Sequence, residues 1–300
     1  MLLSSILSKA GISFVIENER EFLSLGLADY NNKDSVCTFA EKAEYAKKLS
    51  GNISMLIVNK DVADDLSEEE VPFGLCIVDK PRQTFFRVHN ILTNDSKYLL
   101  TAFKTRIDES AIISNTAVIA ENNVHIGKNV IIEEFCVIRE NTTIGDNSII
   151  RAGCKIGGEG FEFKKDGNEV FPVRHVGSVI IGKNTEIQYN SCVDKAIYPW
   201  DSTIIGDYVK VDNLVHIAHA VKIGSGSMIV ANSSIGGRVS IGENSWIGLS
   251  ASVRNGISVG NNARVNMGAV VTRNVSEGKS VSGNFAIDHE SFIEKIKKNN

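Results

Sequence analysis

The chain has 300 residues, 43% of them apolar and 23% charged, enough to bury the cores of about two domains. Its formal net charge of −4 supplies no basic field for collecting phosphates and argues against nucleic acid as the main partner. No apolar run approaches the length of a membrane span, and the first residues lack the pattern of a signal sequence. Five cysteines without a CxxC pair argue against a disulfide framework, so we expect a cytoplasmic protein with no membrane span.

Residues 1–105 show no internal repeat and are predicted to form a separate small α/β domain. The pattern of residues 41–49 is typical of a helix, and residues 54–58 and 75–78 are predicted as strands.

Residues 106–284 are dominated by a six-residue repeat. Its clearest run has an aliphatic residue in twelve consecutive hexads: Ile205, Val211, Ile217, Ile223, Ile229, Ile235, Ile241, Ile247, Val253, Val259, Val265 and Val271. An earlier run follows the same rule: Ile126, Ile132, Ile138, Ile144, Ile150 and Ile156. A period of six fits neither an α-helix nor a long strand, but it suits short strands separated by bends, each with one large aliphatic side chain pointing inward. The repeat therefore predicts a mainly β fold, a parallel β-helix.

The hexads resemble those of the hexapeptide-repeat acyltransferases, whose coils are left-handed, triangular and three hexads long. That resemblance implies a left-handed β-helix with 18 residues per coil and four uninterrupted coils over residues 205–276. Cys136 and Cys154 would then lie one coil apart in the stacked interior, as small core residues.

Two breaks interrupt the hexad register, at residues 158–178 and 195–202. A stacked core cannot absorb insertions, so both are expected to leave the coils as external loops, which often build sites. After the coils, residues 287–298 have helical apolar spacing and predict a short amphipathic helix within a C-terminal segment, residues 285–300.

The candidate catalytic residues begin in the hexads that hold Asp212, Asn213 and His219, all at turn positions. His219 is the third residue of its hexad, so its ring is expected to project from a corner of the coil. Gly237 follows one coil later. An imidazole beside exposed backbone N–H groups can take a proton from an amine while an oxyanion is stabilised.

The same edge continues to Asn255 and Gly256. From the spacing alone, a corner histidine without chemistry is the more common case, because solenoid corners often carry polar residues.

The string Asp212-Asn213, followed by Ile-Ala-His at residues 217–219, resembles the signature of the UDP-3-O-(3-hydroxyacyl)glucosamine N-acyltransferase family of lipid A biosynthesis. Residues 157–163, Gly-Gly-Glu-Gly-Phe-Glu-Phe, and residues 177–182, Gly-Ser-Val-Ile-Ile-Gly, match the loop of that family and its re-entry into the coils. The resemblance runs in order over nearly the whole chain.

This resemblance implies acyl transfer from a thioester to the amino group of a UDP-linked amino sugar, with no tightly bound cofactor. It makes His219 the general base and Gly237 the oxyanion amide, with Asp212 and Asn213 as polar neighbours of the base. Phe39 and Tyr45 would stack on the nucleotide base. It also implies a homotrimer that takes its acyl group from acyl carrier protein or a coenzyme A thioester.

Three departures from the family pattern leave the acyl donor open. Residues 42–44, Lys-Ala-Glu, replace the usual Asn-Pro-Lys, and the C-terminal helical segment is short. A second family histidine, which helps to hold the phosphopantetheine arm, falls on Gly256. Val270, on a late coil, is a candidate stop for the acyl tail, although an interior valine is the more ordinary interpretation.

Other functions remain open at this point. One is a coenzyme A-dependent N-acyltransferase for O-antigen or another surface glycan, and another is a structural solenoid without catalysis. Zinc at His216 and His219 is disfavoured, because residues three apart on a β-coil face different directions and need a third ligand. A nucleotidyltransferase is excluded, because residues 1–105 contain no glycine-rich phosphate loop.

Overall fold

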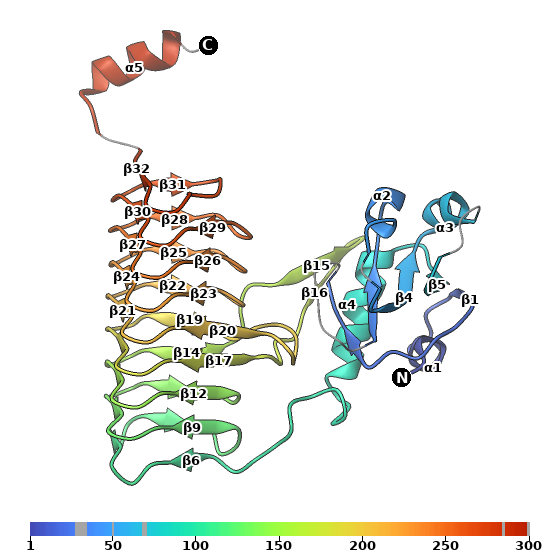
Figure 1. Cartoon of the computed structure of the whole chain (residues 1–300), viewed down its shortest axis with the longest axis horizontal. Helices are drawn as coiled ribbons and strands as arrows, with labels where there is room; N and C mark the ends of the chain where they lie inside the picture. The colour runs from blue at the N-terminus through green and yellow to red at the C-terminus, as the bar shows by residue number, and fades with distance from the viewer. Residues whose placement is uncertain (28–34, 50, 68–70, 284–285, 299–300) are drawn as a thin grey trace. The chain divides into compact units, whose positions relative to one another are not determined.

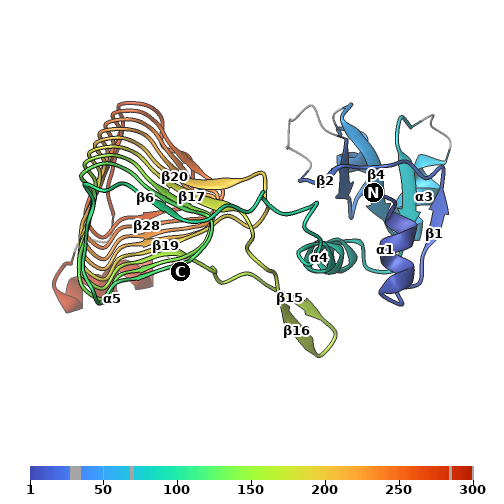
Figure 2. The ribbon, with the colours of Figure 1, turned by 90° about the horizontal axis from the view of Figure 1, so that it is seen from below.

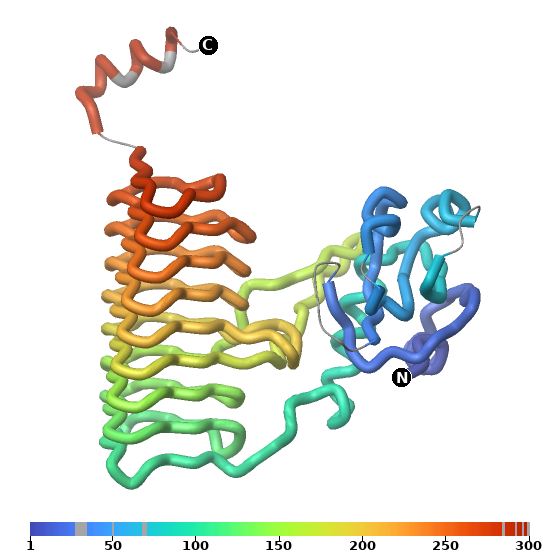
Figure 3. The backbone as a smooth tube through the Cα atoms, in the orientation of Figure 1, coloured from blue at the N-terminus to red at the C-terminus, as the bar shows by residue number. Residues whose placement is uncertain are grey.

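The computed structural model describes residues 1–27, 35–49, 51–67, 71–283 and 286–298. Internal contacts divide the chain into two compact units. The first unit comprises Met1–Thr101, Phe161–Gly177 and Ile197–Trp200. The second comprises Ala102–Gly160, Ser178–Ala196 and Asp201–Asn300, and its stacked coils can be followed in Figure 3.

The first unit is built on a mixed sheet with the strand order β1-β5-β4-β3-β2 (Figure 1). Only β1 runs antiparallel to its neighbour within this sheet of described strands. The strands are β1 (Val15–Glu17), β2 (Ser24–Leu25), β3 (Val36–Phe39), β4 (Ile53–Val58) and β5 (Gly74–Ile77). The helices are α1 (Leu3–Lys9), α2 (Ala43–Ala46), α3 (Lys60–Leu66) and α4 (Pro81–Leu92).

The predicted α/β character of this region is confirmed, and both predicted strands are present, as β4 and β5. The predicted helix over residues 41–49 is shorter and spans only Ala43–Ala46. Its first residue lacks a side-chain cap, because Lys42 stands at the N-cap position.

The second unit is a parallel β-helix built from three sheets, whose triangular coils Figure 2 shows nearly end-on. The β6 sheet contains β6 (Arg106–Ile107), β9 (Val124–Ile126), β12 (Thr142–Ile144), β17 (Ser178–Ile181), β20 (Ser202–Ile205), β23 (Lys222–Ile223), β26 (Ser240–Ile241) and β29 (Ser258–Val259). The β7 sheet contains β7 (Ile112–Ile113), β10 (Ile131–Ile132), β13 (Ile149–Ile150), β18 (Glu186–Ile187), β21 (Lys210–Val211), β24 (Met228–Ile229), β27 (Trp246–Ile247), β30 (Arg264–Val265) and β32 (Ser280–Val281). The β8 sheet contains β8 (Val118–Ile119), β11 (Val137–Ile138), β14 (Lys155–Gly158), β19 (Cys192–Asp194), β22 (His216–Ile217), β25 (Ser234–Ile235), β28 (Ser252–Val253) and β31 (Val270–Val271).

The hexad prediction of a parallel β-helix is thereby confirmed. In most of the two-residue strands one side chain points outward and the next, an aliphatic one, points inward, because successive side chains of a strand face opposite sides. The inward residues stack with a repeat of 18, as in Ile217 opposite Ile235. Cys136 and Cys154 are both fully buried and unpaired in this core, as expected.

Asparagine turns the chain at many corners of the coils. Asn129, Asn147 and Asn262 have φ values of 54°, 59° and 55°, which is the left-handed region. The short amide side chain of asparagine tolerates this conformation better than most residues do.

Both breaks in the register leave the coils, as expected. The first break contains an antiparallel hairpin, β15 (Phe163–Asp166) and β16 (Glu169–Pro172), where the sequence suggested only a loop. The second break lies between the end of β19 at Asp194 and the start of β20 at Ser202. The residues at the centre of each break belong to the first unit.

The predicted C-terminal helix is present as α5 (His289–Lys298). Asp288 caps its start by accepting a hydrogen bond of 3.1 Å from the backbone N–H of Ser291. Among the residues that the structure describes, no helix combines the length and the apolar character needed to cross a bilayer.

Candidate active site

His219 lies in the turn between β22 and β23, and its side chain is half-buried. The register of β23 and β26, with Lys222 opposite Ser240, places Gly237 one coil after His219. A Cβ atom at Gly237 would lie only 2.6 Å from Nε2 and 2.7 Å from Cε1 of His219. The imidazole therefore lies directly against the backbone of Gly237, and only glycine leaves room for it.

The backbone N–H of Gly237 is available to a ligand. At the equivalent turn positions of the two flanking hexads, the N–H of Ala231 donates to Asp212 Oδ2 and the N–H of Glu243 donates to Asn261 Oδ1. Among the described residues, the N–H of Gly237 donates to no acceptor. An unused amide beside an imidazole is what an oxyanion site requires.

Asp212 and Asn213 lie at a different corner, in the turn between β21 and β22. The Asp212 carboxylate accepts hydrogen bonds from the N–H of Asn213, at 2.7 Å, and of Ala231, at 3.1 Å. Asn213 Oδ1 accepts one from the N–H of Tyr189, at 3.1 Å. Within one copy of the chain, these bonds cap backbone groups at that neighbouring corner.

Sequence reasoning missed an ion pair at the corner of His219. Asp201 is only 6% exposed, and the register of β20 and β23 places it one coil before His219. Its Oδ2 lies 3.3 Å from Nη1 of Arg238, the residue that follows Gly237. Asp201 stands 18 residues before His219, so the hexad period could have found it, but the second register break hid that spacing.

A second missed pair joins His216 and Asp194. His216 points outward from β22, and its Nε2 lies 3.0 Å from Oδ2 of Asp194, at the end of β19. This hydrogen bond raises the pKa of His216 above its usual value, outweighing the opposing effect of partial burial. Within the described ranges, no three His, Cys, Asp or Glu side chains come together as a metal site.

The two residues predicted to meet the donor both lie on late coils. Gly256 has a φ of 72°, donates its N–H to the carbonyl of Gly237 at 3.0 Å, and has open space where a side chain would begin. Val270 points outward and is 61% exposed, so its interpretation as an interior valine is wrong. The strand alternation assigns the interior position to its neighbour Val271.

Phe39 and Tyr45 belong to the first unit. Phe39 ends β3 and is half-buried, with its ring centroid 5.0 Å from that of Phe85 and 6.2 Å from that of Phe86. Tyr45 lies on α2 and is 54% exposed. Phe39 therefore contributes to the aromatic core of the first unit, whereas Tyr45 is open to a ligand.

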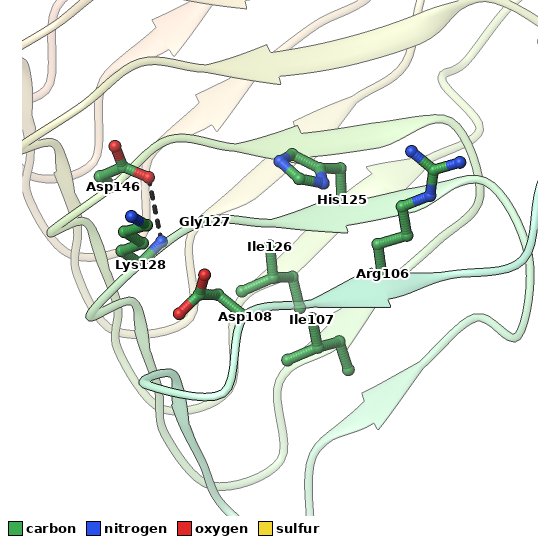
Figure 4. A pocket seen from close by; sticks show the side chains of 8 residues that line it. All are labelled: Arg106, Ile107, Asp108, His125, Ile126, Gly127, Lys128 and Asp146. Atoms are coloured by element: carbon green, nitrogen blue, oxygen red, sulfur yellow. Dashed lines mark hydrogen bonds between the residues drawn. The ribbon is translucent and has the colours of Figure 1, made fainter.

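A pocket of about 330 Å³ lies on the first coils of the β-helix (Figure 4). Its charged lining has both signs: Arg106, Lys128, Asp108 and Asp146. Asp146 accepts a hydrogen bond of 2.9 Å from the backbone N–H of Lys128. None of the predicted site residues lines this pocket.

Comparison with known proteins finds the hexads in family models. The model "Bacterial transferase hexapeptide (six repeats)" matches residues 123–158 and 202–237, which include His219 and Gly237. The model "Hexapeptide repeat of succinyl-transferase" matches residues 238–273.

Several curated relatives are UDP-3-O-acylglucosamine N-acyltransferases. One from Legionella pneumophila is 45% identical over 93 residues, covering 31% of this chain and 26% of that protein. One from Rickettsia akari is 46% identical over 93 residues, with the same coverage. One from Francisella tularensis subsp. holarctica is 37% identical over 130 residues, covering 41% of this chain and 33% of that protein. The matches thus span about a quarter to a third of the length of these relatives. They also cover less of this chain than expected, since the motifs suggested a resemblance over nearly the whole chain.

Similar solved structures include UDP-N-acetylglucosamine acyltransferases. The one from Campylobacter jejuni is 19% identical, with a TM-score of 0.44, covering 64% of this chain and 82% of that chain. The one from Bacteroides fragilis is 20% identical, with a TM-score of 0.45, covering 65% and 78%. Hexads of this chain match models of bacterial transferase hexapeptides, and the resemblance to the UDP-3-O-acylglucosamine N-acyltransferases is confirmed over the part of the chain that these relatives match.

Proposed function

We propose that the protein transfers an acyl group from a thioester to the amino group of a nucleotide-linked amino sugar. The observation that carries this proposal is the His219 imidazole lying against Gly237, whose N–H donates to no acceptor among the described residues. The names of the relatives support a UDP-linked acceptor and N-acyl transfer. The 3-hydroxyacyl group and the place in lipid A biosynthesis are what the resemblance of the sequence implies. The five unpaired cysteines suit a reducing compartment, which we take to be the cytoplasm.

In this mechanism the amine nitrogen attacks the thioester carbonyl while His219 removes its proton. The carbonyl oxygen becomes negative and accepts a hydrogen bond from the N–H of Gly237. The C–S bond then breaks with its electron pair going to sulfur, which leaves an amide and a thiolate; the thiolate takes up a proton to become the thiol. Gly237 thus provides both the space for the base and the donor for the oxyanion.

The test of this function offers the purified protein a 3-hydroxyacyl carrier-protein thioester and the matching coenzyme A thioester. Each donor is paired with UDP- and dTDP-linked amino sugars, and the amide is quantified by mass spectrometry. We expect the carrier-linked long acyl group to react. A preference for short acyl groups on coenzyme A would instead favour a surface-glycan N-acyltransferase. If neither donor supports transfer, acyl transfer is contradicted and a structural solenoid without catalysis is favoured.

A carrier protein needs a docking surface that complements its acidic helix. The basic residues proposed for this contact lie on α5 and the late coils: Lys295, Lys297, Lys298, Arg254, Arg264 and Arg273. Arg264 lies over the ring of Trp246, at 4.7 Å, which orders one of these cations.

We further propose a homotrimer, whose number of subunits comes from the resemblance. Its support is a column of exposed apolar side chains, all in turns between the β7 sheet and the β8 sheet. These side chains are between 44% and 67% exposed: Phe135, Tyr189, Leu214, Leu249 and Met267. Neighbouring copies would cover this column.

Introducing a charge into this column is expected to dissociate the trimer. Leu249→Asp should sediment as a monomer at micromolar concentration, because a buried carboxylate without a partner is costly. Leu23→Asp, at a residue of the first unit that is 65% exposed, should stay trimeric. A monomeric parent protein, or a trimeric Leu249→Asp variant, would contradict the proposal.

Nucleotide stacking predicts different results for the two aromatic residues of the first unit. Tyr45→Ala should raise the KM for the sugar nucleotide more than it lowers kcat, because stacking is shared by the ground and transition states. Its melting temperature should not change, since Tyr45 is exposed. Phe39→Ala should also lower the melting temperature, because it removes the contact with Phe85. An unchanged KM for the Tyr45→Ala variant would show that Tyr45 does not bind the nucleotide.

A further inference from the structure

The His216–Asp194 pair has no part in the reaction as described so far. His216 lies three residues before His219, and its side chain is 51% exposed. An ionised carboxylate only accepts hydrogen bonds, so Nε2 of His216 carries a hydrogen and donates it to Asp194 Oδ2, at 3.0 Å. One nitrogen of the ring is thereby fixed, while the other, Nδ1, is left to meet a ligand.

The surroundings of His216 favour its protonated form. Asp194 is 8% exposed, and a buried carboxylate is costly unless a cation neutralises it. The groups facing the ring from neighbouring strands are Cys192, opposite on β19, and Ser234, opposite on β25. Burial raises the pKa of the Cys192 thiol, so neither group is charged at neutral pH. The next cation in this column, Lys155, donates to backbone carbonyls.

The spacing of the two histidines suits the two ends of one reacting group. Their Cα atoms are three residues apart and so are separated by at most about 10 Å. In the tetrahedral intermediate, the amine nitrogen and the thioester sulfur are bonded to the same carbon. The two rings face different directions: His219 lies against Gly237, one coil later, and His216 is hydrogen-bonded to Asp194, one coil earlier. A base at the nitrogen and an acid at the sulfur would therefore approach that carbon from opposite directions along the coil axis.

An ordinary alkyl thiol has a pKa of about 8.5, so at neutral pH the departing sulfur takes up a proton, which a general acid can supply as the C–S bond breaks. We propose, on the basis of the proposed acyl transfer, that His216 is the general acid for the leaving thiolate and that Asp194 is its positioning residue. As the C–S bond breaks, the electron pair goes to sulfur, which takes the proton from Nδ1 of His216. His219 holds the proton taken from the amine, and the products are an amide and a thiol. Proton exchange with water then returns His219 to its neutral form and His216 to its protonated form.

Leaving-group chemistry tests this assignment. Two donors are compared, an alkyl thioester and an aryl thioester of the same acyl group, because an aryl thiolate departs without needing a proton. His216→Gln should lose about 10²-fold in kcat with the alkyl donor and only a few-fold with the aryl donor. His219→Ala should lose activity with both donors. His125→Gln, which changes another exposed outward histidine, on β9, should behave as the parent protein does.

The other outcomes of this comparison would each overturn one or both proposals. Equal losses of His216→Gln with the two donors, or no loss, would overturn the general-acid assignment while leaving the acyl transfer itself intact. Absence of transfer by the parent protein with either donor would overturn both proposals. His216 is exposed, so its glutamine variant is expected to fold.

The role of Asp194 has its own readout. With the alkyl donor, the rate should fall as the pH rises through the raised pKa of His216, because the acid form is then lost. Asp194→Asn removes the cause of that rise, so the fall should begin at lower pH. A pH profile that Asp194→Asn leaves unchanged would overturn the positioning role.

Discussion

Replacing His219 by alanine is expected to lower kcat by about 10²–10⁴-fold, the usual contribution of a general base. The loss follows from the position of the ring, which lies against the backbone of Gly237 at the corner of the coil. The melting temperature of the coils should stay the same, because their core consists of inward aliphatic residues from all three sheets.

The matched control for this variant is His125→Ala, on an early coil of the same β-helix. It should retain the activity of the parent protein. Near-normal turnover by purified, folded His219→Ala would remove His219 from the mechanism.

Gly237→Ala is expected to have the second-largest effect, a loss of about 10²-fold in kcat, as misplacement of a catalytic group by about 1 Å can cause. The added Cβ would lie 2.6 Å from His219 Nε2, so the ring must move. The φ of Gly237 is not in the left-handed region, so the backbone can accept alanine there. Gly283→Ala is the control, because no atom lies within 4 Å of its added Cβ.

A double variant separates displacement of the base from loss of the oxyanion donor. Alanine at position 237 keeps the backbone N–H, so in a His219→Ala background the Gly237→Ala change should cost little more. Losses that simply multiply would contradict the idea that Gly237 acts by making room for the imidazole.

The β-helix could be predicted from the hexads, because a strict period of six leaves one inward residue per strand and thus sets the stacking register. The same register brought His219 and Gly237 together, since they are 18 residues apart. The alternation within each two-residue strand could also have shown that Val270 points outward, because Val271 is the residue on the aliphatic repeat.

The polar partners were harder to find. Asp194 precedes the second register break and Asp201 lies within it, so counting hexads forward from Ile156 assigns neither to a coil position. Their contacts with His216 and Arg238 depend on how the chain re-enters the coils. In the first unit, the strands have clear apolar runs, whereas α2 is a four-residue helix whose ends depend on capping.

The most direct test of acyl transfer to an amine is the chemical linkage in the product. A UDP-linked amino sugar presents one amine and several hydroxyls, and hydroxylamine cleaves esters but leaves amides intact. After incubation with an acyl thioester and treatment with hydroxylamine, we predict that the acylated sugar nucleotide persists in the mass spectrum. An acylated product that hydroxylamine removes, or no acylated product at all, would contradict N-acyl transfer at the corner formed by His219 and Gly237.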